Sequence, residues 1–230
     1  MLDHVAAIRS ESKAFYDAAA KADPDARVPS CPEWSIRELV VHLAEVHAFW
    51  GALVEHGMTD LANVGELERP TLPDDYDELV AHGREMAERM ASIFASADQS
   101  AEVWSWSSQH DVAFVTRHQV QEAAIHRWDL ENAIGSPNAI APDIADDSID
   151  EFLRISLPSR DGWNPGMDIV HLHTTDTGRD WLIEPSGNVE DRGGSADVTL
   201  SATASDLLLA PYRRIPMDGI DAVLGGLAFT

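Results

Sequence analysis

The segment from Arg117 to Asp129 constrains the fold of this chain more than any other. It contains no Gly or Pro and is flanked by residues that favour helices, so it predicts the middle of a helix of about 20 residues over 111–134. Glu122 and His126 stand one turn apart on one side of that helix, which places a carboxylate and an imidazole within reach of one cation. Two ligands do not make a metal site. A solvated face that carries two unrelated histidines is therefore the alternative.

The composition argues against several classes of protein. A formal net charge of −24 would repel phosphate backbones, so we expect no nucleic-acid partner. The single cysteine, Cys31, excludes an internal disulfide framework. No apolar run approaches the roughly 18 residues of a membrane span, and the first residues lack the basic and apolar regions of a signal peptide. We therefore expect a cytoplasmic protein without a membrane partner.

Three further segments of the first half have helical periodicity, namely 2–22, 36–57 and 74–97. Ser35 and Glu38 have the spacing of a capping box at the start of the second helix. The segment 28–34 is expected to be a rigid connection with two prolines, and 58–73 to be a loop. Together with 111–134, these helices predict a four-helix bundle over residues 1–138, in which sites are built from facing helices.

The second predicted helix carries two histidines that could complete a metal site. His47 lies within the apolar face of this helix and His42 lies at its edge, so periodicity predicts that His47 is the more buried. A lone histidine on an apolar face is more often a hydrogen-bonded core residue than a ligand. Glu45 and His56 are expected to face solvent.

The pattern changes near 138–142, and residues 139–230 predict a small α+β domain. The expected helices lie over 144–155 and through 207–209, the latter capped by Ala204-Ser205-Asp206. The expected strands lie over 168–174, 180–184 and 197–203, with a hairpin loop over 175–179 and a short strand or helix within 220–229. His171 and His173 share one face of the first strand. They could bind a metal or line a pocket, or they could be a packed or exposed pair.

Several motifs in both halves resemble those of a known family. Pro29–Ser35 leading into Val41–Ala44, and Gln121–Asp129, are similar to motifs of the mycothiol-dependent maleylpyruvate isomerase family, which belongs to the DinB-like metal-binding bundles of actinobacteria. Val170–His173, Trp181–Ile183 and Ala196–Leu209 resemble the C-terminal domain of the same family. The final helix of the family tends to close on a Gly-Arg pair. This chain has Arg213-Arg214 there, so only Arg214 matches.

The resemblance implies a divalent metal, usually zinc, held by His42, Glu122 and His126 with the fourth position free. It thereby favours His42 over His47. It also implies mycothiol as a cosubstrate and an isomerase or S-transferase activity, in which a thiolate adds to an electrophilic small molecule.

Other residues could assist the implied reaction. Arg213 and Arg214 are candidates to bind a dicarboxylate substrate, and Arg127 is a weaker one because the helical turn carries it off the metal-facing side. Each could instead be a structural or surface arginine. His118 and Asp129 share the metal-facing side and could orient the ligands.

Two other classes of function remain open at this point. One is a metal-dependent hydrolase on the same bundle, in which the metal activates water. The other is a non-catalytic small-molecule or lipid-binding protein. The sequence does not specify the physiological substrate, the metal or the oligomeric state.

Overall fold

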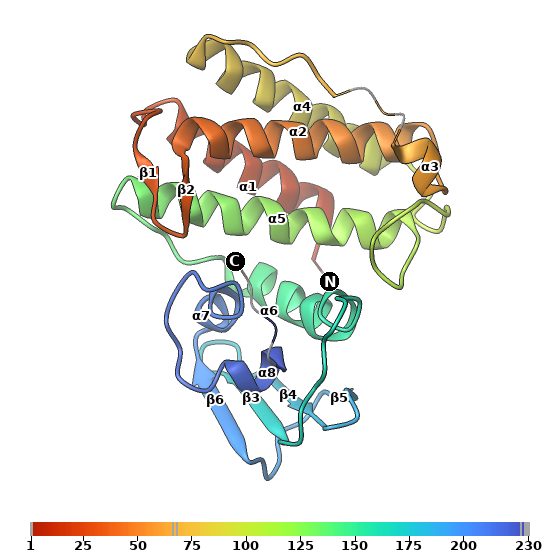
Figure 1. Ribbon diagram of the computed structural model, residues 1–230, viewed down its shortest axis with the longest axis vertical. Coiled ribbons are helices and arrows are strands. Elements are labelled where there is room, and N and C mark those ends of the chain that lie inside the picture. Colours follow the sequence, from red (N-terminus) through yellow and green to blue (C-terminus); the bar gives the residue numbers. More distant parts are fainter. Residues whose placement is uncertain (1, 66, 68, 226, 228–230) are drawn as a thin grey trace. The chain divides into compact units, whose positions relative to one another are not determined.

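The computed structural model describes residues 2–65, 67, 69–225 and 227, which form two compact units, Met1–Asn138 and Ala139–Thr230 (Figure 1). The first is mainly helical and the second contains a four-stranded sheet, so the α+β fold class is confirmed. Within the described part of the chain, no helix combines the length and the apolar character that crossing a bilayer requires. The elements of the first unit are α1 (His4–Ala19), β1 (Arg27–Val28), β2 (Cys31–Ser35), α2 (Ile36–Glu55), α3 (Leu61–Val64), α4 (Tyr76–Ser96) and α5 (Val112–Ala133).

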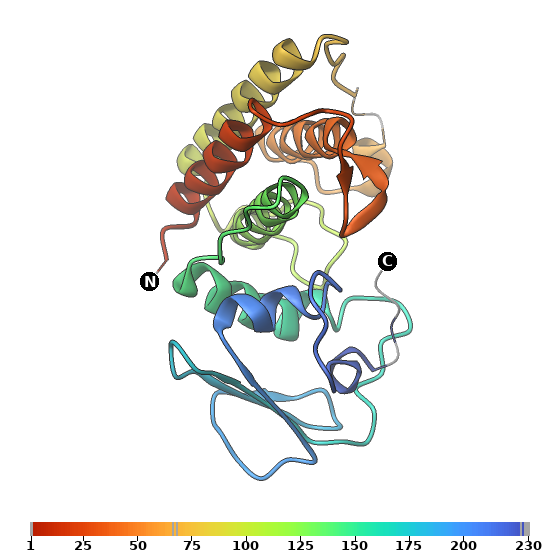
Figure 2. The same ribbon diagram turned by 90° about the vertical axis from the view of Figure 1, so that its left-hand side faces the viewer.

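The four long helices form the predicted bundle. α2 packs against α4 and α5, and α1 packs against the same two helices (Figures 1 and 2). The predicted capping box starts α2: the Ser35 backbone N–H donates to Glu38 Oε2 at 2.6 Å, and the Glu38 N–H donates to Ser35 Oγ at 3.4 Å. Phe15, Leu39 and Leu43 are fully buried where the helices meet. The apolar stripes read from the sequence therefore do form the core.

α1 and α4 approach each other closely at Gly83. A Cβ atom at this position would lie 2.5 Å from the ring of Tyr16, so only glycine fits. The contact holds Tyr16 in the interior, where it is fully buried.

Two connections differ from their prediction. The segment expected to be only a rigid connection contains the antiparallel hairpin of β1 and β2, in which Val28 pairs with Cys31 and Arg27 with Ser35. Such a two-stranded ribbon tolerates proline in β2 because each strand has a free edge. The expected loop after α2 contains the one-turn helix α3, which Asp60 caps by accepting a hydrogen bond from the Ala62 N–H at 2.8 Å.

The second unit combines helices with a mixed sheet. Its elements are α6 (Pro142–Glu151), a wider π-helical turn η1 (Phe152–Ser156), β3 (Val170–Thr174), β4 (Asp180–Ile183), β5 (Val189–Glu190), β6 (Val198–Ala202), α7 (Ala204–Leu209) and α8 (Asp221–Leu224). The strand order is β5-β4-β3-β6, with β3 and β6 parallel and the other pairs antiparallel. The three predicted strands and the two predicted helices are confirmed, and β5 was not predicted.

The sheet has one covered face. α6 and α7 lie on it (Figures 1 and 2), and Val170, Leu172 and Thr174 of β3 are buried. The intervening residues of β3 therefore point to the other face. Thr203, rather than the predicted Ala204-Ser205-Asp206, caps α7, because its side chain accepts a hydrogen bond from the Asp206 N–H.

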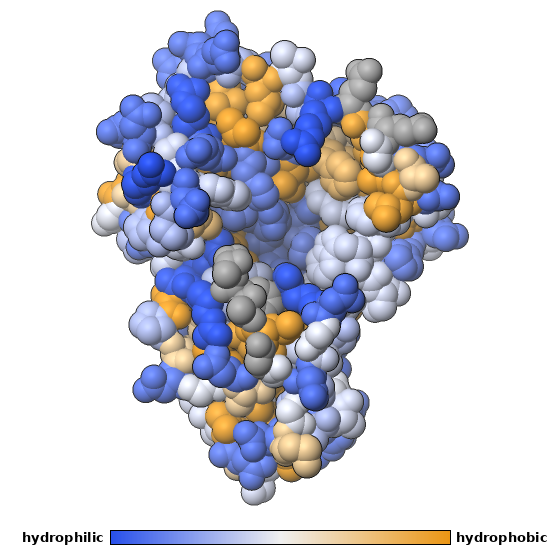
Figure 3. All heavy atoms as spheres, viewed as in Figure 1, coloured by the Kyte–Doolittle hydropathy of each residue, from blue (hydrophilic) through white to orange (hydrophobic). Residues whose placement is uncertain are grey.

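The last predicted element is partly described. α8 supplies a short helix, while residues 226 and 228–230 of the same predicted segment lie outside the described residues. Much of the face shown in Figure 3 is hydrophilic, as a net charge of −24 leads one to expect.

Candidate metal centre

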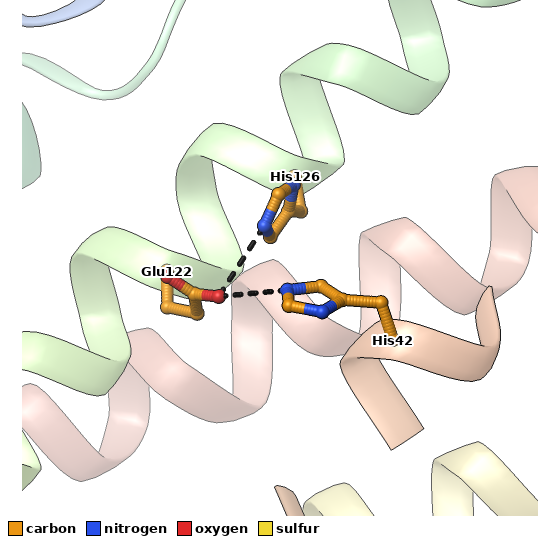
Figure 4. A group of neighbouring side chains, drawn as sticks. All are labelled: His42, Glu122 and His126. Carbon is orange, nitrogen blue, oxygen red and sulfur yellow. Dashed lines mark hydrogen bonds and ion pairs between the residues drawn. The ribbon is translucent and has the colours of Figure 1, made fainter. Parts of the chain in front are cut away.

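The structure brings His42, Glu122 and His126 together. His42 projects from α2 and the other two from α5, and all three side chains point toward one another (Figure 4). Glu122 Oε1 lies 3.1 Å from His42 Nε2 and 3.3 Å from His126 Nε2. One carboxylate oxygen of Glu122 thus faces the imidazole nitrogens of His42 and His126, two residues that are far apart in the sequence.

This geometry fits a tetrahedral cation. One donor atom from each of the three residues lies within 4.8 Å of the others. Ligand bonds of about 2.0–2.1 Å at tetrahedral angles put neighbouring donor atoms about 3.3 Å apart, close to the spacings of the carboxylate oxygen from the two nitrogens. Two histidines and one glutamate form the donor set of catalytic zinc sites that keep a fourth position open. The residues present therefore fit the metal that the family resemblance implies.

The surroundings of the cluster are strongly polarised. Burial opposes the charged form of His126, but the carboxylates of Glu122 and Asp129 outweigh it and raise the pKa of His126 to about 9. Burial also opposes the charged form of Glu122, but His126 and His42 outweigh it and hold the pKa of Glu122 well below its usual range. Without a metal the site is therefore an ion pair. A divalent cation would take the place of the proton on His126.

Asp129 supports the cluster from behind. Its Oδ2 lies 3.0 Å from His126 Nδ1, and its Oδ1 accepts a hydrogen bond from Ser30 Oγ at 2.6 Å. Asp129 is fully buried and His126 is only 7% exposed, so the alternative of a solvated face is wrong for this part of α5. A carboxylate bonded to the far nitrogen of a ligating histidine fixes the ring and its tautomer.

The β1–β2 hairpin contributes to the same site. Ser30 lies in its turn, and the Trp34 ring in β2 lies 4.8 Å from that of His42. The sequence did not point to Ser30, although it belongs to the motif Pro29–Ser35 that carried the family resemblance. A serine 99 residues away from its carboxylate partner leaves no local signal.

His47 belongs to the core, as its position on the apolar face predicted. It is 1% exposed, and its Nδ1 lies 3.2 Å from the hydroxyl of Tyr16. Burial lowers the pKa of His47 to about 3, so the ring is neutral. The edge position of His42 explains the difference: its side chain is 32% exposed and reaches the cluster.

The other residues singled out in the sequence have different surroundings. His118 packs against aromatic rings, 5.7 Å from Phe114 and 5.2 Å from Trp106, and it lies close enough to Glu122 to help lower the pKa of that carboxyl. Arg127 points away from the cluster, as the helical turn predicted. Its buried guanidinium pairs with Glu11 at 2.5 Å and Glu131 at 2.6 Å. This position favours the structural interpretation of Arg127 over substrate binding.

Arg213 and Arg214 lie in the second unit, just after α7. Arg213 pairs with Asp221, and Arg214 donates to the carbonyl of Tyr212 at 2.9 Å. Nothing in these contacts tests a role in binding substrate, so that role stays a prediction.

A groove opens beside His42. It has a volume of 220 Å³ and is lined by His42, Glu45, Val46, Ala48, Phe49, Ala52, Leu67, Arg69 and Pro70. Glu45, which was expected to face solvent, is part-buried and lines this groove. Arg69 was not singled out in the sequence. It forms no ion pair with any residue that the structure describes.

Comparison with known proteins identifies the family of the chain. The family model of the mycothiol maleylpyruvate isomerase N-terminal domain matches residues 5–131, which is more than half of the chain. No curated protein sequence matches. A crystal structure of the mycothiol-dependent maleylpyruvate isomerase superposes with a TM-score of 0.57 at 16% identity, covering 93% of this chain and 89% of that one. A histidine-to-alanine mutant of that enzyme gives the same TM-score and coverage at 15% identity. The chain belongs to the mycothiol maleylpyruvate isomerase family.

Proposed function

We propose that this protein is a divalent-metal-dependent isomerase or S-transferase that uses mycothiol as its cosubstrate and zinc as its metal. The observation that carries the proposal is the convergence of His42, Glu122 and His126 on one point in a domain of this family. The half-exposed His42 borders a groove, so a small molecule can reach the cluster. We place the protein in the cytoplasm, where a low-molecular-weight thiol stays reduced.

Each residue of the cluster has a distinct task. His42 and His126 each offer an Nε2 lone pair, and Glu122 supplies the negative charge. Asp129 keeps the proton of His126 on Nδ1, so Nε2 stays free for the cation. Bound in this way, a divalent cation lowers the pKa of a thiol, so that the thiolate is available at neutral pH.

The groove would receive the electrophile. Its walls at Val46 and Phe49 are apolar, and the guanidinium of Arg69 offers a partner for a carboxylate. Glu45 lies in the same groove and would disfavour anions on its own side. We therefore assign the carboxylate-binding part of the groove to its Arg69 wall.

The proposed reaction leaves the thiol unchanged. The thiolate sulfur adds to one carbon of an activated cis double bond, and the electron pair of that bond moves onto the adjoining carbonyl. Rotation about the resulting single bond precedes return of the electron pair, which expels the thiolate and leaves the trans isomer. An electrophile that cannot expel the thiolate takes up a proton and remains an S-adduct, which would be S-transfer.

The test combines metal content with turnover. Untagged protein is analysed for bound metal and assayed with maleylpyruvate and other electrophiles, with and without mycothiol. We expect His42→Ala to lose one equivalent of metal together with the thiol-dependent turnover. His56→Ala, which changes an exposed histidine directly after α2, should retain both.

Three results would contradict the proposal. Full metal content in His42→Ala would remove the proposed site. Turnover without any thiol would indicate a metal-dependent hydrolase instead. Binding of apolar ligands with no turnover when thiol and metal are supplied would indicate a binding protein.

A further inference from the structure

Glu45 is the one carboxylate of α2 that has no partner among the residues the structure describes. The other two glutamates of this helix are paired: Glu38 accepts the Ser35 N–H in the capping box, and Glu55 accepts a hydrogen bond from Arg89 at 2.7 Å. Glu45 is part-buried, and no described residue forms a hydrogen bond or an ion pair with it. Partial burial of an unpaired carboxylate costs free energy. The side chain is therefore suited to bind a cation from outside the chain.

Arg69 adds a second unpaired charge, of opposite sign, to the same groove. Other arginines of this unit pair with carboxylates, namely Arg9, Arg84, Arg89 and Arg127. Arg69 forms no such pair within the described part of the chain, and it does not pair with Glu45. The groove thus keeps a carboxylate and a guanidinium apart, so both are available to one ligand.

The two charges have different positions relative to the metal cluster. Glu45 follows His42 by three residues on α2, which puts their Cβ atoms about 5–6 Å apart on one face of the helix. Arg69 belongs to the connection between α2 and α4, so it lines the groove from a separate segment. The groove volume of 220 Å³ admits only a small ligand. A cationic group of that ligand would bind beside the metal ligand His42.

We propose that the electrophile which enters this groove is a small zwitterion, whose ammonium group pairs with Glu45 and whose carboxylate pairs with Arg69. Its identity as the electrophile rests on the proposed function, whereas its charge pattern rests on the groove alone. A dicarboxylate brings a second negative charge toward Glu45, and a simple cation leaves Arg69 unpaired, so both bind less well. Glu45 is thereby a specificity-determining residue.

Calorimetric binding of two unreactive ligands tests the charge pattern. They are the monoamides of succinic acid with dimethylaminoethylamine and with isopentylamine, which share the carboxylate and the shape but differ in the ammonium group. We expect the full-length, untagged protein to bind the zwitterionic amide about tenfold more tightly. Glu45→Gln should bind both amides equally, and Arg69→Gln should bind both more weakly. Glu85→Gln, which changes an exposed carboxylate of α4, should retain the preference.

The corresponding monoamides of maleic acid extend the test to turnover, because they carry an activated cis double bond. With mycothiol supplied, we expect the same preference in kcat/KM for isomerisation, and we expect Glu45→Gln to remove it. Equal affinity for the two succinic amides, binding of neither, or a preference that persists in Glu45→Gln would overturn the zwitterion assignment.

The two measurements separate this inference from the proposed function. Preferential binding of the zwitterion without thiol-dependent turnover of any electrophile would support the assignment of the groove and contradict the proposed function. Thiol-dependent turnover with equal affinity for the two succinic amides would support the proposed function and overturn the assignment. Far-UV circular dichroism of each variant verifies that a lost preference does not reflect a lost fold.

Discussion

The two units build similar polar clusters in opposite ways. In Met1–Asn138, Glu122 faces His42 and His126 from helices, and its partner His42 is 80 residues away. In Ala139–Thr230, Asp180 faces two histidines at most nine residues away, on paired strands. The first cluster needs the whole bundle to be folded, whereas a single strand pairing assembles the second.

One arginine in each unit pairs with two carboxylates, but the two arginines differ in how exposed they are. The Arg127 side chain in the bundle is 6% exposed and lies between Glu11 and Glu131. Arg154 in the other unit pairs with Asp150 and Asp191 at 2.8 Å each, but its side chain is 31% exposed. Burial strengthens a charge pair and raises the cost of breaking it, so similar contacts in the two units should differ in energy.

The largest expected effect compares these two arginines. Arg127→Met leaves two carboxylates without their buried cation and should lower the free energy of unfolding by about 3–5 kcal/mol. Arg154→Met, the matched change in the other unit, should cost no more than about 1 kcal/mol. Urea unfolding followed by circular dichroism measures both. Equal losses would show that burial does not distinguish the two networks.

The next effect concerns the carboxylate behind the metal cluster. Asp129→Asn should weaken zinc binding at the bundle site by about 10–100-fold, because His126 loses the charge that orients its ring. Competition with a chromophoric chelator measures the affinity, and Asp161→Asn serves as the control. An unchanged affinity would mean that the three ligands suffice without this support.

His47 predicts a pH dependence for the bundle. Its pKa of about 3 lies below the value of an unfolded histidine, so below about pH 6.5 the unfolded chain binds a proton that the folded chain does not. Its contribution to stability is therefore present at neutral pH and is lost as the pH decreases. The free energy of unfolding should fall by about 2 kcal/mol from pH 6.5 to pH 5.

The test compares the free energy of unfolding at pH 6.5 with that at pH 5, measured on metal-free protein by urea unfolding. His47→Gln should lose about 2 kcal/mol less than the wild type over this interval. His56→Gln, at an exposed position, should follow the wild type. If the unfolding free energy of His47→Gln depends on pH as strongly as that of the wild type, other groups cause the acid sensitivity.

The smallest expected effect is at the second cluster. Asp180→Asn removes the charge of a part-exposed group, so it should change the unfolding free energy of the metal-free protein by no more than about 1 kcal/mol. A much larger loss would indicate that Asp180 mainly holds β3 and β4 together, which would weaken the comparison with the bundle cluster. Urea unfolding of the metal-free wild type and variant supplies the measurement.

Local patterns in the sequence predicted the elements well. The capping box at Ser35, the four long helices and the strands β3, β4 and β6 all follow from periodicity and turn residues over short windows. The short elements α3 and β5 were missed because windows of two to four residues carry too little pattern.

The candidate site was predictable only in part. The pair Glu122 and His126 follows from helical spacing, but the choice of His42 came from the family resemblance, since periodicity ranked His47 first for burial alone. The hydrogen bond from Ser30 to Asp129 and the groove at Arg69 depend on how distant segments pack, and one sequence contains no signal for either.

The groove beside His42 lies between a long helix and a connecting segment, which can change in sequence independently of each other. One wall is α2, whose position is fixed by the bundle, and the other includes Arg69 and Pro70 in the connection to α4. Substitutions in that connection alter size and charge around an incoming compound without displacing Glu122 or His126. Under the proposed function, a few substitutions in this connection would change which compounds the groove accepts while His42, Glu122 and His126 stay in place.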